Sequence, residues 1–224
     1  MDYVNHDQKS RDKLVAYIQD AYAMEKAGVE PLERHADQAK GVPVIEAKVW
    51  EHLDQTRRHQ ARMEERLRAH GAQPSAVKGA LGALAGAATG AVSGARPDPI
   101  AMNTRDEYVN EHLEIASYAM LMATARAFGD EETVNAAALN AQDEVAMQGW
   151  LAKHVAEVGL LALQQDGLTI PESAWQFARD GADVASIAGT GKDGYDDEDA
   201  ADIKAFAQSL TPAQSDQTVS NVDW

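Results

Sequence analysis

The chain has 224 residues, of which 45% are apolar, and it carries a formal net charge of -16 with no cysteine. This length accommodates one or two domains with a sizeable core, and the lack of cysteine excludes disulfides, thiolate zinc sites and cysteine nucleophiles. The strong negative charge makes nucleic acid and anionic membrane poor partners. The first residues are polar and do not form a signal peptide, so we expect a cytoplasmic protein.

Apolar residues recur at helical spacing in four long segments. The predicted helices span residues of about 10–38, 44–70, 104–129 and 130–159. The third begins with Thr104-Arg105-Asp106-Glu107, which has the pattern of a capping box. Asp130 is the predicted N-cap of the fourth helix.

The connections between these segments predict their directions. The first and second helices are joined by a few residues, as are the third and fourth, so each pair is antiparallel. The connector over residues 71–103 is long enough to traverse a helix of about 38 Å, so the second and third helices run parallel. The predicted fold is all-α: a ferritin-like four-helix bundle with one long crossover and an acidic C-terminal extension.

We predict the bundle over residues 1–165 and the extension, partly disordered, over residues 166–224. The extension should contain a short helix around Trp175 and Phe177 and a second one near residues 200–210. The acidic run at residues 193–202 reads as a solvated tail, because it lacks the spacing of a calcium loop. Residues 76–95 are rich in glycine and alanine, which favours a packed connector over a membrane span.

Each predicted long helix places one residue of metal-ligand type on its apolar stripe: Glu25, His59, Glu111 and Glu144. Glu114 lies one turn after Glu111, nearer the edge of the same face. A charged carboxylate that faces an apolar interior is costly even after relaxation. A bound cation is the simplest reason to keep three such acids and an imidazole at similar depth. The alternative for any single glutamate is an edge position from which its carboxylate reaches water.

The remaining histidines are interpreted as structural or solvent-facing. His52 lies near the inward stripe and is predicted to be a hydrogen-bonded core residue. His112 is ambiguous, and the predicted solvent-side histidines are His6, His35, His70 and His154.

Residues of about 13–160 resemble the YciE/YciF-type ferritin-like proteins of bacteria. The matching stretches are Tyr22-Ala23-Met24-Glu25-Lys26, residues 52–62, Glu111-His112-Leu113-Glu114-Ile115-Ala116-Ser117-Tyr118 and residues 143–151. The resemblance implies a four-helix bundle with a di-iron-type site, often dimeric, in stress-associated proteins. Ferritin-like enzymes usually carry Glu-x-x-His on two helices, whereas Thr56 and Met147 interrupt that pattern here. Gln55 and Gln148 stand where relatives tend to be acidic.

The favoured function is protection against oxidative or general stress by a non-haem di-metal carboxylate site that reacts with dioxygen or peroxide, or binds metal. Two iron ions are the first expectation and manganese the second. Glu111 and Glu144 are the bridging candidates, and Glu25, Glu114 and His59 are the terminal ligands. We expect a homodimer or a larger homo-oligomer.

The alternative function is a metal-free structural or self-assembling bundle that has lost part of its ligand set. Gln55, Met147 and Gln148 argue for it, because fewer anionic ligands weaken the binding of a second hard cation. No nucleophile motif supports a hydrolase, and no organic substrate is identifiable.

Overall fold

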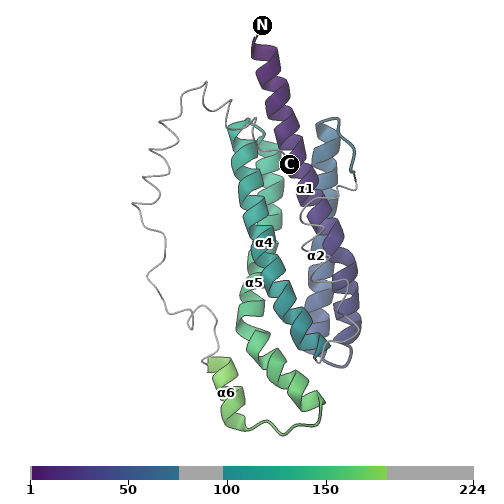
Figure 1. Ribbon diagram of the computed structural model, residues 1–224, viewed down its shortest axis with the longest axis vertical. Coiled ribbons are helices and arrows are strands. Elements are labelled where there is room, and N and C mark those ends of the chain that lie inside the picture. The colour runs from purple at the N-terminus through teal and green to yellow at the C-terminus, as the bar shows by residue number, and fades with distance from the viewer. Residues whose placement is uncertain (1, 76–97, 181–224) are drawn as a thin grey trace, which may run out of the picture. The chain divides into compact units, whose positions relative to one another are not determined.

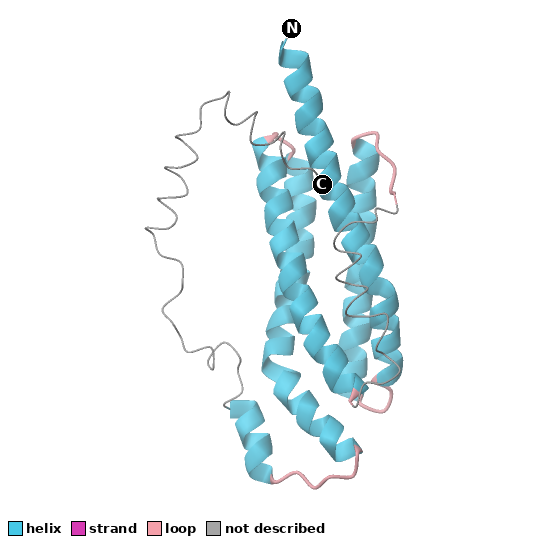
Figure 2. Cartoon of the chain, in the orientation of Figure 1, coloured by secondary structure: helices cyan, strands magenta, loops and turns pink. Residues whose placement is uncertain are grey.

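The computed structural model describes residues 2–75 and 98–180, and every regular element in these ranges is a helix (Figures 1 and 2). The helices are α1 (Asp2–Gln38), α2 (Pro43–Ala69), α4 (Pro99–Ala127), α5 (Glu131–Gln165) and α6 (Glu172–Asp180). The predicted all-α fold is therefore confirmed. None of these helices is long and apolar enough to span a bilayer.

The four long helices form two antiparallel pairs, α1 with α2 and α4 with α5 (Figure 1). Two buried apolar clusters lie at opposite ends of the bundle. Helix α2 begins in one cluster with Ile45 and ends in the other with Leu67, and α4 likewise runs from Ile100 to Ala125. Because α2 and α4 start in the same cluster, they run parallel, as the long crossover predicts. Most of that crossover, residues 76–97, lies outside the described residues, as does the predicted packed connector at 76–95.

The start of α4 differs from the prediction. The helix begins at Pro99. A proline is favourable in the first turn, because the backbone N–H that it lacks would have no partner within the helix there. Thr104 is buried inside the helix, and its hydroxyl donates to the Ile100 carbonyl at 2.9 Å instead of capping an N-terminus. The predicted capping box is thus wrong. By contrast, Asp130 caps α5 as predicted, because its side chain accepts from the Thr133 backbone N–H at 3.0 Å.

The C-terminal boundaries also shift. Helix α5 continues past Gly159 to Gln165, since a glycine inside a helix lowers its stability without ending it. Helix α6 confirms the predicted short helix and packs against α5. The predicted helix at 200–210 and the acidic run at 193–202 lie outside the described residues. The proposed division at residues 165 and 166 stays a prediction.

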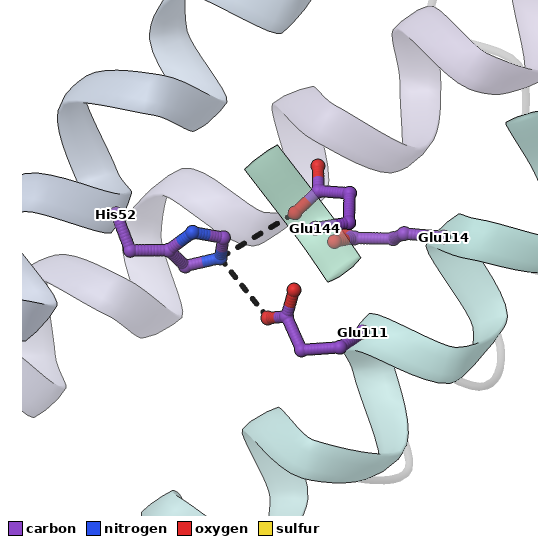
Figure 3. A group of neighbouring side chains, drawn as sticks. All are labelled: His52, Glu111, Glu114 and Glu144. Atoms are coloured by element: carbon purple, nitrogen blue, oxygen red, sulfur yellow. Dashed lines mark ion pairs between the residues drawn. The ribbon is translucent and has the colours of Figure 1, made fainter. Parts of the chain in front are cut away.

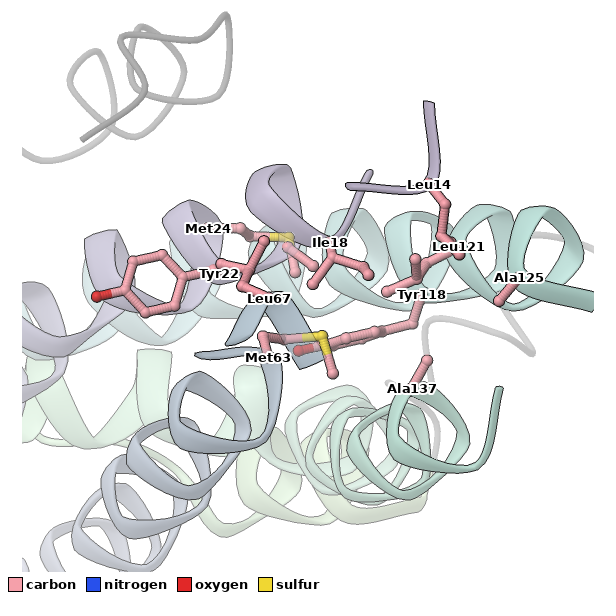
Figure 4. Close-up of a cluster of buried hydrophobic side chains, with 11 residues drawn as sticks. Leu14, Ile18, Tyr22, Met24, Met63, Leu67, Tyr118, Leu121, Ala125 and Ala137 are labelled. Carbon is pink, nitrogen blue, oxygen red and sulfur yellow. The ribbon is translucent and has the colours of Figure 1, made fainter. Parts of the chain in front are cut away.

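The two apolar clusters enclose a polar layer at the middle of the bundle. Figure 4 shows the first cluster, in which Leu14 and Ile18 of α1 pack with Leu121 and Tyr118 of α4. On α5, the buried residue Glu144 lies between Ala137 of the first cluster and Val158 of the second. Glu25 on α1, His59 on α2 and Glu111 on α4 likewise lie between residues of the two clusters, so all four long helices contribute a buried polar side chain to this layer. This arrangement positions the site described next.

Candidate metal centre

Six buried side chains form two overlapping groups with the composition of metal sites. The first group contains His52, Glu111, Glu114 and Glu144 (Figure 3). The second contains Glu25, His59 and Glu144. Within each group, every residue offers a ligand atom within 4.8 Å of those of the others. Glu144 belongs to both groups, whereas Glu111 belongs to the first alone.

The first group draws on α2, α4 and α5. His52 Nε2 lies 3.0 Å from Glu111 Oε1 and 4.0 Å from Glu144 Oε2. Figure 3 shows the carboxylates of Glu111, Glu114 and Glu144 directed toward the same space beside the His52 ring. Glu111 and Glu114 reach it together because residues three apart on a helix share a face.

The second group draws on α1, α2 and α5. His59 Nδ1 lies 2.8 Å from Glu144 Oε1 and 3.6 Å from Glu25 Oε2. The 2.8 Å contact between His59 Nδ1 and Glu144 Oε1 is an ion pair that lacks hydrogen-bond geometry, because His59 Nδ1 has no hydrogen-bond partner among the described residues. All three side chains are fully buried.

A chain of hydrogen bonds leads into the second group from the side of α2. Arg62 Nη1 donates to Asn140 Oδ1 at 2.7 Å, and Asn140 Nδ2 donates to the Tyr118 hydroxyl at 2.8 Å. The Tyr118 hydroxyl in turn donates to Glu25 Oε1. The three hydrogen bonds are donated in one direction, from Arg62 toward Glu25. They therefore connect a positively charged guanidinium group to a buried carboxylate of the second group. Burial, with Glu25 beside it, raises the pKa of Tyr118, and the hydroxyl therefore keeps its proton.

Burial also controls the protonation of the acids. Burial, followed by repulsion from Glu144, raises the pKa of Glu111 and of Glu114 well above the ordinary range. Burial likewise raises the pKa of Glu25, although its contact with His59 opposes the rise. Burial alone would lower the pKa of His59, but Glu144 and Glu25 outweigh it and raise that pKa to about 10. In the absence of a cation, these groups hold extra protons.

The residues present fit a cation. Glu25 Oε2, Glu111 Oε2 and both carboxylate oxygens of Glu144 are buried without a hydrogen-bond donor from the described part of the chain. Leaving such atoms unpaired is costly, and coordination to a cation would use them. Carboxylate oxygens with a few imidazole nitrogens suit iron or manganese better than metals that prefer sulfur.

The structure brings together all five residues predicted as ligands: Glu25, His59, Glu111, Glu114 and Glu144. It adds His52, for which the sequence predicts only a hydrogen-bonded core position. The missed signal is its spacing, since His52 precedes His59 by two helical turns and lies on the same stripe.

His35 corrects a second prediction. It is buried rather than solvent-facing, and its Nδ1 contacts Glu107 Oε1, with Glu107 one turn before Glu111. Neither residue belongs to the two groups.

The residues that depart from the family pattern have other contacts. Thr56 is buried and donates to the His52 carbonyl at 3.1 Å. Met147 is buried in the core. Gln148 donates to the Tyr108 hydroxyl at 3.5 Å, and Gln55 Oε1 lies 3.4 Å from His52 Nδ1.

Several solved structures are similar to this chain. A protein of Xanthomonas campestris is 27% identical with a TM-score of 0.60, and the match covers 71% of this chain and 99% of that one. YcfI, a putative structural protein from Rhodopseudomonas palustris, is 24% identical with a TM-score of 0.56 and coverages of 63% and 92%.

The E. coli stress protein YciF is 18% identical with a TM-score of 0.53, and the match covers 71% of this chain and 98% of YciF. At these identities, YcfI and YciF support the fold alone. A family model matches over residues 9–163, and the chain therefore belongs to the family described as Domain of unknown function (DUF892).

Proposed function

We propose that the protein holds two iron or manganese ions in this centre and serves in protection against oxidative or general stress. The observation that carries the proposal is the convergence of four buried carboxylates and two imidazoles with unpaired carboxylate oxygens. Such a pair of ions, when bound, supplies electrons for a reaction with dioxygen or peroxide.

Each residue has a role in this proposal. Glu144 would contribute a ligand to both metal positions, because it belongs to both groups. Glu25 and His59 would complete one position, and His52 with Glu111 and Glu114 would complete the other. In this assignment Glu111 would serve the His52 position alone, and Glu144 would be the ligand shared by both positions. Tyr118 holds Glu25 by donating a hydrogen bond to it. The apolar clusters on both sides separate the centre from the two ends of the bundle.

A metal-free structural bundle is the second candidate. It is favoured by the position of His59 between Glu25 and Glu144, which raises the pKa of His59 to about 10. A charged imidazole can offset one acid, and the raised pKa of Glu111 and of Glu114 lets those two become neutral. In this case charge balance would come from protons instead of metal.

A metal titration separates the two candidates. Metal-free protein is titrated anaerobically with ferrous iron and, separately, with manganese, and we expect binding to approach two equivalents. Glu144→Gln should weaken both positions, because Glu144 is shared. Glu30→Gln is the matched control, since Glu30 is an exposed acid on the same bundle. Binding of less than about half an equivalent of both metals by the wild-type protein rejects the metal centre.

The proposed assembly is a homodimer or a larger homo-oligomer. It is supported by large apolar side chains that α4 and α5 leave exposed, which are Val109, Met120, Leu139 and Val145. Light scattering at several protein concentrations tests it, and a monomer at all of them contradicts the proposal.

A further inference from the structure

The two imidazoles of the centre face the acids with different ring nitrogens. His52 directs Nε2 to Glu111, at 3.0 Å, and its Nδ1 faces Gln55 Oε1 at 3.4 Å. His59 directs Nδ1 to Glu144, at 2.8 Å, and its Nε2 lies 3.0 Å from Asp143 Oδ2. Each ring therefore has one nitrogen at the centre and the other beside an outer partner.

The outer partners differ in charge and in distance. Asp143 offers a carboxylate oxygen to His59, whereas Gln55 offers a neutral amide oxygen to His52 at a longer separation. A hydrogen bond to an ionised acceptor is roughly twice as strong as one between neutral groups. An outer acceptor fixes the tautomer and the orientation of a metal-binding imidazole and makes it a more basic ligand. His59 therefore has the stronger outer support.

The partners also differ in how the fold supplies them. Gln55 lies on α2 with His52, three residues further along, so this contact depends on one helix alone. Asp143 lies on α5 and immediately precedes Glu144, so α5 contributes both the shared carboxylate and the outer partner of a ring on α2. Asp143 is at the rim, with its side chain 32% exposed, while His59 is fully buried.

Resting on the proposed two-metal function, we propose that Asp143 and Gln55 are positioning residues that make the two metal positions unequal. Asp143 holds the His59 ring so that Nδ1 faces its metal ion, and it strengthens that position. Gln55 holds the His52 ring so that Nε2 faces the other ion, and it does so more weakly. Gln55 stands where relatives tend to carry an acidic residue. In this chain it would instead support the His52 ring.

Stepwise binding of cobalt(II) tests the proposal, because its visible absorption reports each position without any turnover. Wild-type protein should give two binding constants. Asp143→Ala should weaken one of them by about 10- to 100-fold and leave the other within a factor of about two. Asp143→Asn keeps an acceptor without the charge and should fall between wild type and Asp143→Ala. Gln55→Ala should weaken the other constant, by a smaller factor.

A spectroscopic measurement distinguishes positioning from simple structural support. A cobalt-bound imidazole carries one exchangeable proton on its outer nitrogen, visible as a shifted NMR signal, and the wild-type protein should show two. Loss of the Asp143 acceptor should speed solvent exchange of the His59 proton and leave that of His52 unchanged. The signals are assigned from His52→Ala and His59→Ala. Asp54→Asn, which removes an exposed charge from α2, is the matched control and should behave as wild type.

The outcomes separate this inference from the proposed function. If wild-type protein binds two cobalt ions and Asp143→Ala changes neither constant nor the exchange rate, the positioning role is overturned while the metal centre stands. Equal weakening of both constants also overturns it, because that is the effect of general destabilisation. If wild-type protein binds less than about half an equivalent of cobalt, the metal centre itself fails, and the positioning role fails with it.

Discussion

Glu111→Gln should have opposite effects on stability in the metal-free and the metal-loaded protein. In the metal-free protein, Glu111 is buried beside Glu144, and burial followed by this repulsion raises its pKa well above the ordinary range. Glutamine has nearly the same shape and no charge, so it removes the repulsion and the cost of burying an ionised group. In the loaded protein the same change removes a proposed ligand.

The size of the gain in the metal-free protein is limited by the protonation of the unfolded chain. An unfolded glutamate has a pKa of about 4.3, and each pH unit above it adds about 1.4 kcal/mol to the cost of keeping the group neutral. The penalty at pH 7 is therefore at most about 4 kcal/mol. The buried glutamine amide must itself find partners, so we expect about half of this gain, about 2 kcal/mol.

The sign of the pH dependence follows from the same shift. A carboxyl group whose pKa is raised by folding binds more protons in the folded state, so it destabilises the fold increasingly as pH rises above about 4.3. His59 acts in the same direction, because its pKa is raised to about 10 and its stabilising charge, complete below about pH 6.5, is lost as pH rises toward 10. Metal-free wild-type protein should lose stability from about pH 5.5 to 8, and Glu111→Gln should lose less.

Urea unfolding in EDTA at several pH values in this range, followed by circular dichroism, measures both effects. Glu30→Gln serves as the control for the loss of one negative charge. With iron or manganese present at about 100 times its Kd, binding at the position that Glu111 serves should raise the free energy of unfolding of the wild-type protein by about 2.7 kcal/mol. The variant should lack this increase. The reasoning is refuted if Glu111→Gln in EDTA at pH 8 is no more stable than wild type, or if the two proteins show the same pH dependence.

Three further changes test the surrounding structure. Asp130→Ala should cost about 2 kcal/mol in urea unfolding at neutral pH, because it removes the N-cap of α5. Partial burial raises the pKa of Asp130, but hydrogen bonds from Thr133 outweigh it and lower that pKa to about 2, so this contribution is present above about pH 4 and fades as pH falls through 2. Leu121→Ala should cost about 2–5 kcal/mol in the same assay, since Leu121 is fully buried, whereas exposed Leu168→Ala should change stability by less than about 0.5 kcal/mol. Tyr118→Phe should lower the free energy of unfolding by about 1–3 kcal/mol by leaving buried hydrogen-bond partners unpaired, and unchanged thermal stability would contradict the hydrogen-bonded chain.

The sequence alone determined the four long helices, apart from the start of α4 and the end of α5, together with their directions and most of the centre. Helical periodicity is a local property, so Glu25, Glu111 and Glu144 could be placed on core-facing stripes without knowledge of the neighbours. Short and long connectors likewise predicted two antiparallel pairs joined by a crossover, because chain length limits which helix ends can meet. Asp130 could be identified as a cap because its acceptor lies within one turn.

Only the tertiary structure decided which inward residues meet. The periodicity that placed His59 inward applies equally to His52, but the relative depth of four packed helices brings His52 beside Glu111. Packing between α1 and α4 likewise buries His35 against Glu107. The outer contact of Asp143 depends on side-chain rotamers across two helices. Spacing along one helix determines the face on which a residue lies. Contacts between helices depend in addition on the axial shift and rotation of each packed helix relative to the others.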